Sequence, residues 1–382
     1  MNTIALGELV LTNAKIVLAD EVYEGSVRVD GGMITDIGEK SRTGLDLDGD
    51  YLIPGLVELH TDHLETHYAP RPKVRWNPVA AVQAHDAQIA ASGITTVLDA
   101  IRVGLDEHAD MGAVEMKILA DAIKAGMDAG RLRAEHHIHL RCEVSAPDCL
   151  DGFNSIKDHS LVRLASLMDH APGQRQFASM DAYKTYYQGK LKMSDAALEE
   201  FTQRRNAESI AHAGPHRRAI AAACQELGIV LASHDDATRD HVEEAVALGT
   251  DVAEFPTTLE AAKASRQAGM AILMGGPNVV RGGSHSGNVS ARDLAAADLL
   301  DILSSDYIPF SMLQSAFSLA ENVPGISLPK AIQLVTKRPA EAGGFNDRGE
   351  IAVGKRADFV HLRVEDGIPI VLTVWRQGKR VI

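Results

Sequence analysis

Short apolar segments alternate with amphipathic segments along most of the chain. The apolar segments have the length of buried strands, and the segments between them repeat apolar residues three and four positions apart. This alternation of strand and helix patterns favours a parallel sheet. We predict eight strands, at residues 56–60, 95–99, 136–143, 162–168, 229–234, 251–255, 271–274 and 300–306.

The number of these strand–helix units predicts an α/β fold, a (β/α)8 barrel of the TIM type. The helical spacing is clear before the third strand, where Val114, Ile118 and Ala122 recur at every fourth position. The connection at 171–228 is longer than the others and carries several tyrosines. We therefore expect this connection to add helices or a lid.

The two ends of the chain have a different pattern, with short apolar segments separated by turn residues. Gly31 and Gly32 follow Asp30 between two such segments, which is a hairpin signal. Similar segments recur near the C-terminus, at 359–362 and 370–375. We expect residues 1–53 and 346–382 to form one small β-sandwich domain, and residues 54–345 to form the catalytic barrel.

Composition excludes several classes of protein. The chain has 382 residues, 45% hydrophobic residues and a net charge of −14, which argues against a disordered chain and against a dedicated nucleic-acid binder. Three cysteines are too few for a disulfide framework and fit a reducing compartment. We see no signal peptide and no apolar segment long enough to span a membrane. The expectation is a cytoplasmic protein without membrane or nucleic-acid partners.

Metal-ligand side chains stand where the predicted barrel strands end. Active groups of such barrels lie at the carboxyl ends of the strands. His60 and Asp62 end the first strand, Glu143 the third, His234 the fifth and Asp306 the eighth. Imidazole and carboxylate groups bind Zn²⁺, Mn²⁺ or Fe²⁺. We predict that these five residues bind one or two divalent metal ions, with zinc favoured over manganese and iron.

Each of these residues alone has a simpler interpretation. A histidine at a strand end is often a hydrogen-bonded structural residue, and an aspartate there often caps the next helix. The convergence of suitable groups from several strands is what favours a metal site.

Two segments resemble the amidohydrolase superfamily: residues 54–60 (PGLVELH) and residues 354–360 (GKRADFV). The resemblance implies a metal-bearing barrel beside a β-sandwich made from both termini. A narrower resemblance, to the diphosphatases of phosphonate catabolism, covers nearly the whole chain. It is carried by residues 60–62, 69–74, 91–100, 140–143, 166–177, 232–238, 253–258, 276–289 and 301–307.

The narrower resemblance implies a hydrolase acting on a phosphorus-containing anhydride. The reaction would cleave the α–β phosphoanhydride of α-D-ribose 1-methylphosphonate 5-triphosphate and release pyrophosphate, upstream of the carbon–phosphorus lyase. Asp306 would be the catalytic general base. His170, Glu254 and His285 are further candidates for metal or substrate contacts.

The chain departs from the general superfamily pattern in three ways. Asp62 stands two residues after His60, where most members have a second histidine. Glu254 stands in the sixth strand, where a histidine is common. No lysine ends the third or fourth strand, and Glu143 is the natural substitute. These changes leave the metal and the choice between one and two ions open.

Basic residues fit an anionic substrate. A proline-spaced segment with Arg71, Lys73 and Arg75 follows the first strand. A charge run of this kind is usually a solvated surface, but its position places it at the barrel mouth. The residues expected to bind the ribose triphosphate are Arg71, Lys73, Arg75, Arg141, Arg175 and Arg281.

Two other functions stay open at this stage. The same barrel supports C–N hydrolases such as cyclic amidases and deaminases, because fold does not fix function. Such an enzyme needs a mostly neutral pocket, which the arginine-rich loops do not favour. A non-catalytic scaffold would be expected to lose several ligands, which are present here. We also expect a homo-oligomer, with a dimer favoured.

Overall fold

The computed structural model describes residues 8–104, 112–172, 175, 194–283 and 287–382. Within these residues, eight strands form one sheet in sequence order, each parallel to the next. They are β6 (Leu56–Thr61), β7 (Ile94–Val103), β8 (Glu135–Glu143), β9 (Val162–Met168), β10 (Val230–His234), β11 (Val252–Glu254), β12 (Ala271–Gly275) and β13 (Ile302–Ser304). The strand pattern predicted from the sequence is confirmed.

The sheet closes where its first and last strands meet. Thr61 and Asp306 form an isolated parallel bridge. The backbone N–H of Asp62 donates to the Asp306 carbonyl at 3.0 Å, and the N–H of Asp306 donates to the His60 carbonyl at 3.0 Å. These bonds bring the end of β6 beside the residue that follows β13, and the predicted (β/α)8 barrel is confirmed.

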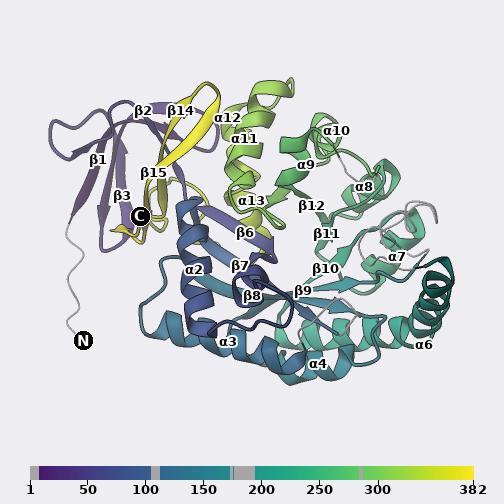
Figure 1. Cartoon of the computed structure of the whole chain (residues 1–382). Coiled ribbons are helices and arrows are strands. Elements are labelled where there is room, and N and C mark those ends of the chain that lie inside the picture. Colours follow the sequence, from purple (N-terminus) through teal and green to yellow (C-terminus); the bar gives the residue numbers. More distant parts are fainter. Residues whose placement is uncertain (1–7, 105–111, 173–174, 176–193, 284–286) are drawn as a thin grey trace.

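Helices alternate with the strands and surround the barrel (Figure 1). They are α1 (His63–Tyr68), α2 (Pro78–Ala91), α3 (Ala113–Asp128), α4 (Cys149–Ile156), α6 (Asp195–Leu227), α7 (Arg239–Ala247), α8 (Leu259–Gln267), α9 (Gly276–Arg281), α10 (Ala291–Ala296), α11 (Ser311–Asn322), α12 (Leu328–Gln333) and α13 (Lys337–Ala342). Several begin as their sequences dictate: the Asn77 side chain caps α2 ahead of Pro78, and the Thr238 hydroxyl caps α7.

The barrel interior is packed with apolar side chains below the strand ends. Strands of a parallel barrel are covered on both faces, so their sequences are nearly continuous apolar runs. The buried residues of this layer include Val57, Leu59, Leu98, Leu164, Ala232, Val252, Leu273 and Ile302. This apolar layer fills the inside of the barrel. The polar residues at the carboxyl ends of the strands lie above it, at the open end of the barrel.

Strands from both ends of the chain join in a second sheet, as expected. Its order is β16-β15-β14-β5-β1-β2-β3, with β4 paired to β1. The strands are β1 (Leu9–Val17), β2 (Val22–Asp30), β3 (Met33–Gly38), β4 (Leu45–Asp46), β5 (Tyr51–Pro54), β14 (Phe359–Glu365), β15 (Ile368–Arg376) and β16 (Lys379–Arg380). Figure 1 shows this sheet beside the barrel. Domain boundaries at residues 54 and 346 stay a prediction.

The long connection before β10 contains α6, as its length led us to expect. This helix begins with a cap by the Ser194 side chain and ends at Gly228, whose φ of 66° few other residues adopt without strain. Residues 173–174 and 176–193, with the tyrosines of this connection, lie outside the described residues. The three cysteines are buried and unpaired. No described helix combines the length and apolar character that crossing a membrane requires.

Candidate metal centre and active site

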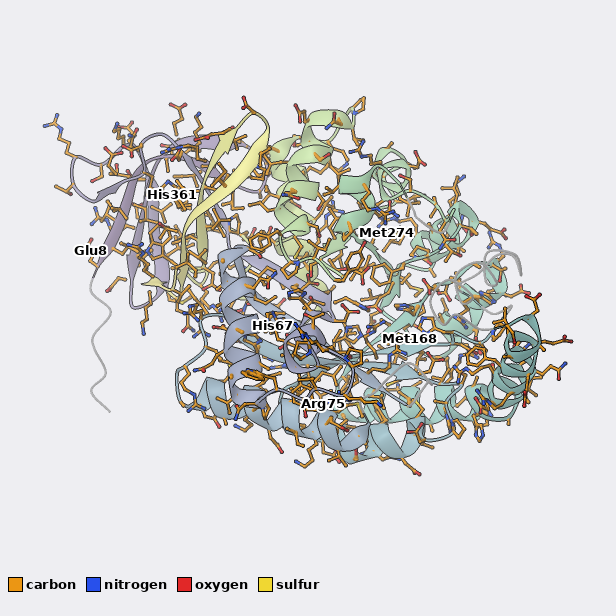
Figure 2. All side chains as sticks on the ribbon, in the orientation of Figure 1. Glu8, His67, Arg75, Met168, Met274 and His361 are labelled. Carbon is orange, nitrogen blue, oxygen red and sulfur yellow. The ribbon has the colours of Figure 1, made fainter. Side chains whose placement is uncertain are left out.

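A cleft opens at the carboxyl ends of the barrel strands. Its floor and walls carry three of the five predicted metal ligands, His60, His234 and Asp306, together with apolar groups such as Met274, labelled in Figure 2. Asp62 and Glu143 are not among the residues that line it. The polar residues that line it include His60, Arg141, His170, His234, Asp235 and Asp306. They lie on β6, β8 and β10 or follow β9, β10 and β13 within two residues, so the barrel itself brings them together.

Glu254 holds two of the predicted ligands in place. Its Oε1 lies 3.1 Å from Nδ1 of His60, and its Oε2 lies 3.0 Å from Nδ1 of His234. A carboxylate at Nδ1 fixes the tautomer that leaves the Nε2 lone pair free, which is the arrangement of many metal-binding histidines. Burial lowers the pKa of both imidazoles to about 3, so they are neutral and able to bind a cation.

Three donors converge on one point of the cleft. Nε2 of His234 lies 3.7 Å, and Nε2 of His170 lies 3.9 Å, from Oδ2 of Asp235. That oxygen is buried and accepts no hydrogen bond. A buried carboxylate oxygen without a donor is costly unless a cation satisfies it. The arrangement of His170, His234 and Asp235 therefore fits a divalent metal ion.

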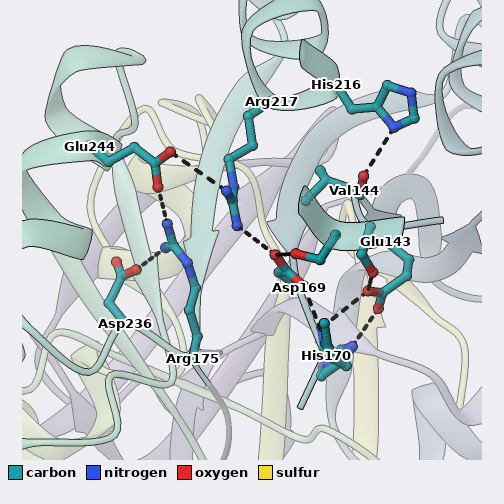
Figure 3. A network of polar contacts seen from close by, with 12 residues as sticks. Glu143, Val144, Asp169, His170, Arg175, His216, Arg217, Asp236 and Glu244 are labelled. Carbon is teal, nitrogen blue, oxygen red and sulfur yellow. Dashed lines mark hydrogen bonds and ion pairs between the residues drawn. The ribbon is translucent and has the colours of Figure 1, made fainter. Parts of the chain in front are cut away.

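Glu143 is fully buried behind this group and orients His170. Its Oε2 lies 2.5 Å from Nδ1 of His170, and its Oε1 accepts from the Ser145 hydroxyl at 2.5 Å. Burial opposes ionisation, but His170 and Arg205 hold the pKa of Glu143 below its usual range. Figure 3 shows this pair next to a network in which Arg217 contacts Asp169.

Asp306 lies at the closing edge of the barrel, near the carboxylates of Asp62, Asp235 and Glu254. Burial, and then the nearby charge of Asp62, raise the pKa of Asp306 to about 7. Arg141 balances part of this charge by donating to Oδ2 of Asp62 at 3.1 Å. Burial likewise raises the pKa of Asp235 to about 6. A carboxylate with a pKa near neutrality is suited to accept and return a proton.

Local backbone conformation aims several of these side chains. Asp235, Phe255 and Asp306 follow β10, β11 and β13, and all have φ between 53° and 57°. Aspartate tolerates this left-handed region better than most residues, and such conformations cluster at active sites. Glu58 adds a further constraint, because it accepts the backbone N–H of His60 and that of Ser305, each at 2.6 Å.

The predicted basic residues fall into three groups. Arg141 and Arg281 line the cleft. Arg175 is buried and paired with Asp236 and Glu244, as Figure 3 shows. Arg71 and Lys73 are exposed on the segment between α1 and α2, as are most of its residues, and neither they nor Arg75 is among the residues that line the cleft. Substrate contacts by Arg175 and by this segment stay predictions.

Two residues of the site were not anticipated. His139 on β8 belongs to a buried group with His60 and Glu254, and Asp235 completes the group with His170 and His234. His139 lies four residues before Glu143, so the alternation along β8 could have identified it. His285, the remaining candidate, lies outside the described residues.

Comparison with known proteins defines the class. Residues 173–382 match the model of the amidohydrolase family. The solved N-acetyl-D-glucosamine-6-phosphate deacetylase of Mycobacterium smegmatis has the same fold, with a TM-score of 0.64 at 16% identity over 98% of this chain and 100% of that one. The chain therefore belongs to the amidohydrolase family, whose members depend on metal ions.

A more specific relative is known from Escherichia coli strain K12. Its α-D-ribose 1-methylphosphonate 5-triphosphate diphosphatase is 48% identical over 377 residues, which cover 98% of this chain and 100% of that protein. An imidazolonepropionase of Streptomyces griseus is more distant, at 24% identity over 94% of this chain and 93% of that protein. The narrower resemblance found in the sequence thus agrees with a full-length relative.

Proposed function

We propose that this protein hydrolyses the α–β phosphoanhydride of α-D-ribose 1-methylphosphonate 5-triphosphate and releases pyrophosphate during phosphonate catabolism. The observation that carries the proposal is the full-length 48% identity with the diphosphatase of E. coli. The cleft supports it, because a cation-binding donor set lies beside the guanidinium groups of Arg141 and Arg281. That combination suits a polyphosphate better than a neutral substrate.

One or two divalent ions would be held at the strand ends. His170, His234 and Asp235 supply one set of donors. His60, Asp62 and Asp306 stay the predicted further ligands, whereas Glu143, also predicted as a ligand, already bonds His170 and Ser145. Zinc is the ion that we favour, because imidazole nitrogens contribute strongly to the set. A cation bound there makes water a stronger nucleophile at neutral pH and offsets the negative charge of the phosphoryl group.

The protein's own residues perform the remaining tasks. The carboxylate of Asp306 takes the proton of the attacking water and returns it to the pyrophosphate leaving group. Glu254 and Glu143 keep the imidazoles oriented. Arg141 and Arg281 contact phosphoryl oxygens and stabilise the charge that shifts toward the leaving group.

Hydrolysis of a C–N bond is the other reaction that this family supports. A cyclic amide carries little charge and gains nothing from guanidinium groups at the cleft. The identity with the diphosphatase also exceeds the 24% identity with the imidazolonepropionase. We therefore do not favour a C–N hydrolase.

Phosphorus NMR of the purified enzyme with the ribose triphosphate tests the proposal directly. We expect the triphosphate resonances to be replaced by those of pyrophosphate and a 5-monophosphate. The Asp306→Asn variant serves as the control for a contaminating phosphatase. Stepwise release of inorganic phosphate, or turnover of a cyclic amide without turnover of the triphosphate, would contradict it.

A further inference from the structure

A second group of histidines lies outside the cleft. His63 and His67 are four residues apart on α1, and His85 lies on α2. Their ring centroids are 5.0 Å apart for His63 and His67, 6.0 Å for His63 and His85, and 5.9 Å for His67 and His85. His67 is labelled in Figure 2. None of the three belongs to the donor set of the active site.

Each of the three rings has a buried nitrogen without a hydrogen-bond partner. The atoms are Nδ1 of His63, Nε2 of His67 and Nδ1 of His85, and the whole His85 side chain is buried. For His63 and His85, neighbouring acceptors explain why the Nδ1 lone pairs are left over. Nε2 of His85 lies 2.7 Å from Oδ1 of Asp99, and Nε2 of His63 lies 2.9 Å from Oε1 of Gln88. Both oxygens accept the ring proton, so the Nδ1 atoms carry bare lone pairs.

The acceptor behind His85 is itself firmly held. Asp99 is fully buried and also lies 2.7 Å from Nδ1 of His136. His136 in turn reaches Asp86, whose Oδ1 accepts the backbone N–H of Arg133 at 2.8 Å. A carboxylate that orients an imidazole and is anchored in this way is a characteristic outer partner of a metal-binding histidine. The arrangement places an anchored carboxylate directly behind the imidazole of His85.

We propose that His63, His67 and His85 bind a divalent transition-metal ion, zinc in the first instance, at a site separate from the active centre. Three imidazoles bound to zinc at ~2.0–2.1 Å have ring centroids roughly 5 Å apart, and the three centroids here lie 5.0–6.0 Å apart. The three rings are not among the described groups whose donor atoms lie within 4.8 Å of one another, so binding would also have to turn the rings until their unpaired nitrogens face the ion. Water completes the coordination shell. The ion would link α1 to α2 and so fix both ends of the basic segment that joins them.

Metal counting tests the proposal without any activity measurement. The protein is stripped with a chelator, zinc is added back, and bound zinc per chain is counted together with the melting temperature. We expect His67→Leu to bind one equivalent less than the wild type and to lose most of one zinc-dependent rise in Tm. His234→Ala alters the active centre instead. This variant should still bind the equivalent of zinc that His67→Leu loses and should keep the rise in Tm that depends on it.

Two further variants make the result specific. His212→Leu removes one member of another histidine pair of the same spacing, in which His216 already bonds the Val144 carbonyl at 3.0 Å. This control should bind as much zinc as the wild type. Gln88→Leu keeps all three imidazoles but removes the acceptor behind His63, and should weaken zinc binding at this site by about 10–100-fold.

The proposal is overturned if His67→Leu and Gln88→Leu both bind zinc as the wild type does. It is also overturned if His212→Leu loses the same equivalent, because the loss would then not depend on this cluster. Gln88 is partly exposed, so its variant gives a reading even if His67→Leu does not fold.

Discussion

Asp306 combines an unusual backbone conformation with a raised pKa at the closing edge of the barrel. We expect Asp306→Asn to keep the fold but to lower kcat by about 10²–10⁴-fold, because an amide of the same shape cannot accept the proton of the attacking water. Pyrophosphate release under saturating substrate measures this, with circular dichroism and bound metal as controls. A variant with near wild-type kcat would remove Asp306 from the reaction.

Arg281 and Lys73 allow two candidate binding sites for the triphosphate to be compared. Arg281 lines the cleft, whereas Lys73 is exposed on the segment between α1 and α2. Loss of a charge-assisted contact costs about 1.5–3 kcal/mol, so Arg281→Ala should raise KM for the triphosphate about 10–100-fold. Lys73→Ala should have a smaller effect. Steady-state kinetics on both variants decides between them, and the reverse order would place the phosphate tail on the basic segment.

The residue scale also shows how far the sequence leads to the site. His60, His234 and Asp306 could be found because buried strands alternate and end in polar groups. Asp235 follows β10 with a φ of 57°, and its direction depends on that turn rather than on any periodicity. The pairing of Arg175 with Asp236 and Glu244 joins parts of the chain far apart in sequence, so only the structure reveals it.

At the scale of elements, the spacing of apolar residues predicted where helices lie along the chain. It was less successful at predicting which face of each helix is buried. Val114 and Ile118 mark α3, but Val114 is 72% exposed and Ile118 is 39% exposed. The buried face is formed by other residues of the helix, including Met116, Leu119 and Ile123. Alanines and glycines on a helix can pack closely against a neighbouring element on more than one face. The sequence alone therefore does not decide which face of α3 is buried.

Gly55, at the start of β6, is required by close packing rather than by an unusual φ. A Cβ at this position would lie 2.3 Å from Oγ1 and 2.6 Å from Cγ2 of Thr95. Gly55→Ala should lower the free energy of unfolding by about 1–3 kcal/mol, the usual cost of overpacking. Denaturant unfolding measures this loss. At Gly38 the nearest atom to such a Cβ is 3.6 Å away, so Gly38→Ala should change stability far less; equal losses would contradict the steric explanation.

At the scale of the whole molecule, Glu135 joins the barrel to the segment that leads into the terminal sheet. It lies at the start of β8, and its Oε1 is 3.1 Å from Nη1 of Arg348 while its Oε2 is 2.5 Å from Nη1 of Arg356. Both arginines are buried. Each also has an acidic partner nearby in sequence, Asp347 and Asp358. Glu135 connects both arginines to the barrel, and Arg348 also donates to the Thr96 hydroxyl on β7 at 2.9 Å.

Removal of the Glu135 charge should therefore destabilise the protein in a pH-dependent way. Burial opposes ionisation, but His137, Arg356 and Arg348 hold the pKa of Glu135 below the usual 4.5. Because the folded state lowers this pKa, its contribution is complete above pH 4.5 and is lost as the pH falls toward the lowered value. We expect Glu135→Gln to cost about 1.5–3 kcal/mol at pH 7, the range for a hydrogen bond to a charged group.

Urea unfolding of the wild type and the variant at several pH values checks both the size and the sign of this effect. The difference between them should be greatest near neutrality and should shrink below pH 4.5 as the wild type loses its advantage. Asp121→Asn is the matched control, because Asp121 forms an exposed pair with Lys117 on α3 and such pairs contribute about 0.2–1 kcal/mol at most. If the loss in free energy of unfolding caused by Glu135→Gln were the same below pH 4.5 as at pH 7, the prediction would be wrong. The shape of the Glu135 side chain, and not its charge, would then hold the segment with Arg348 and Arg356 against the barrel.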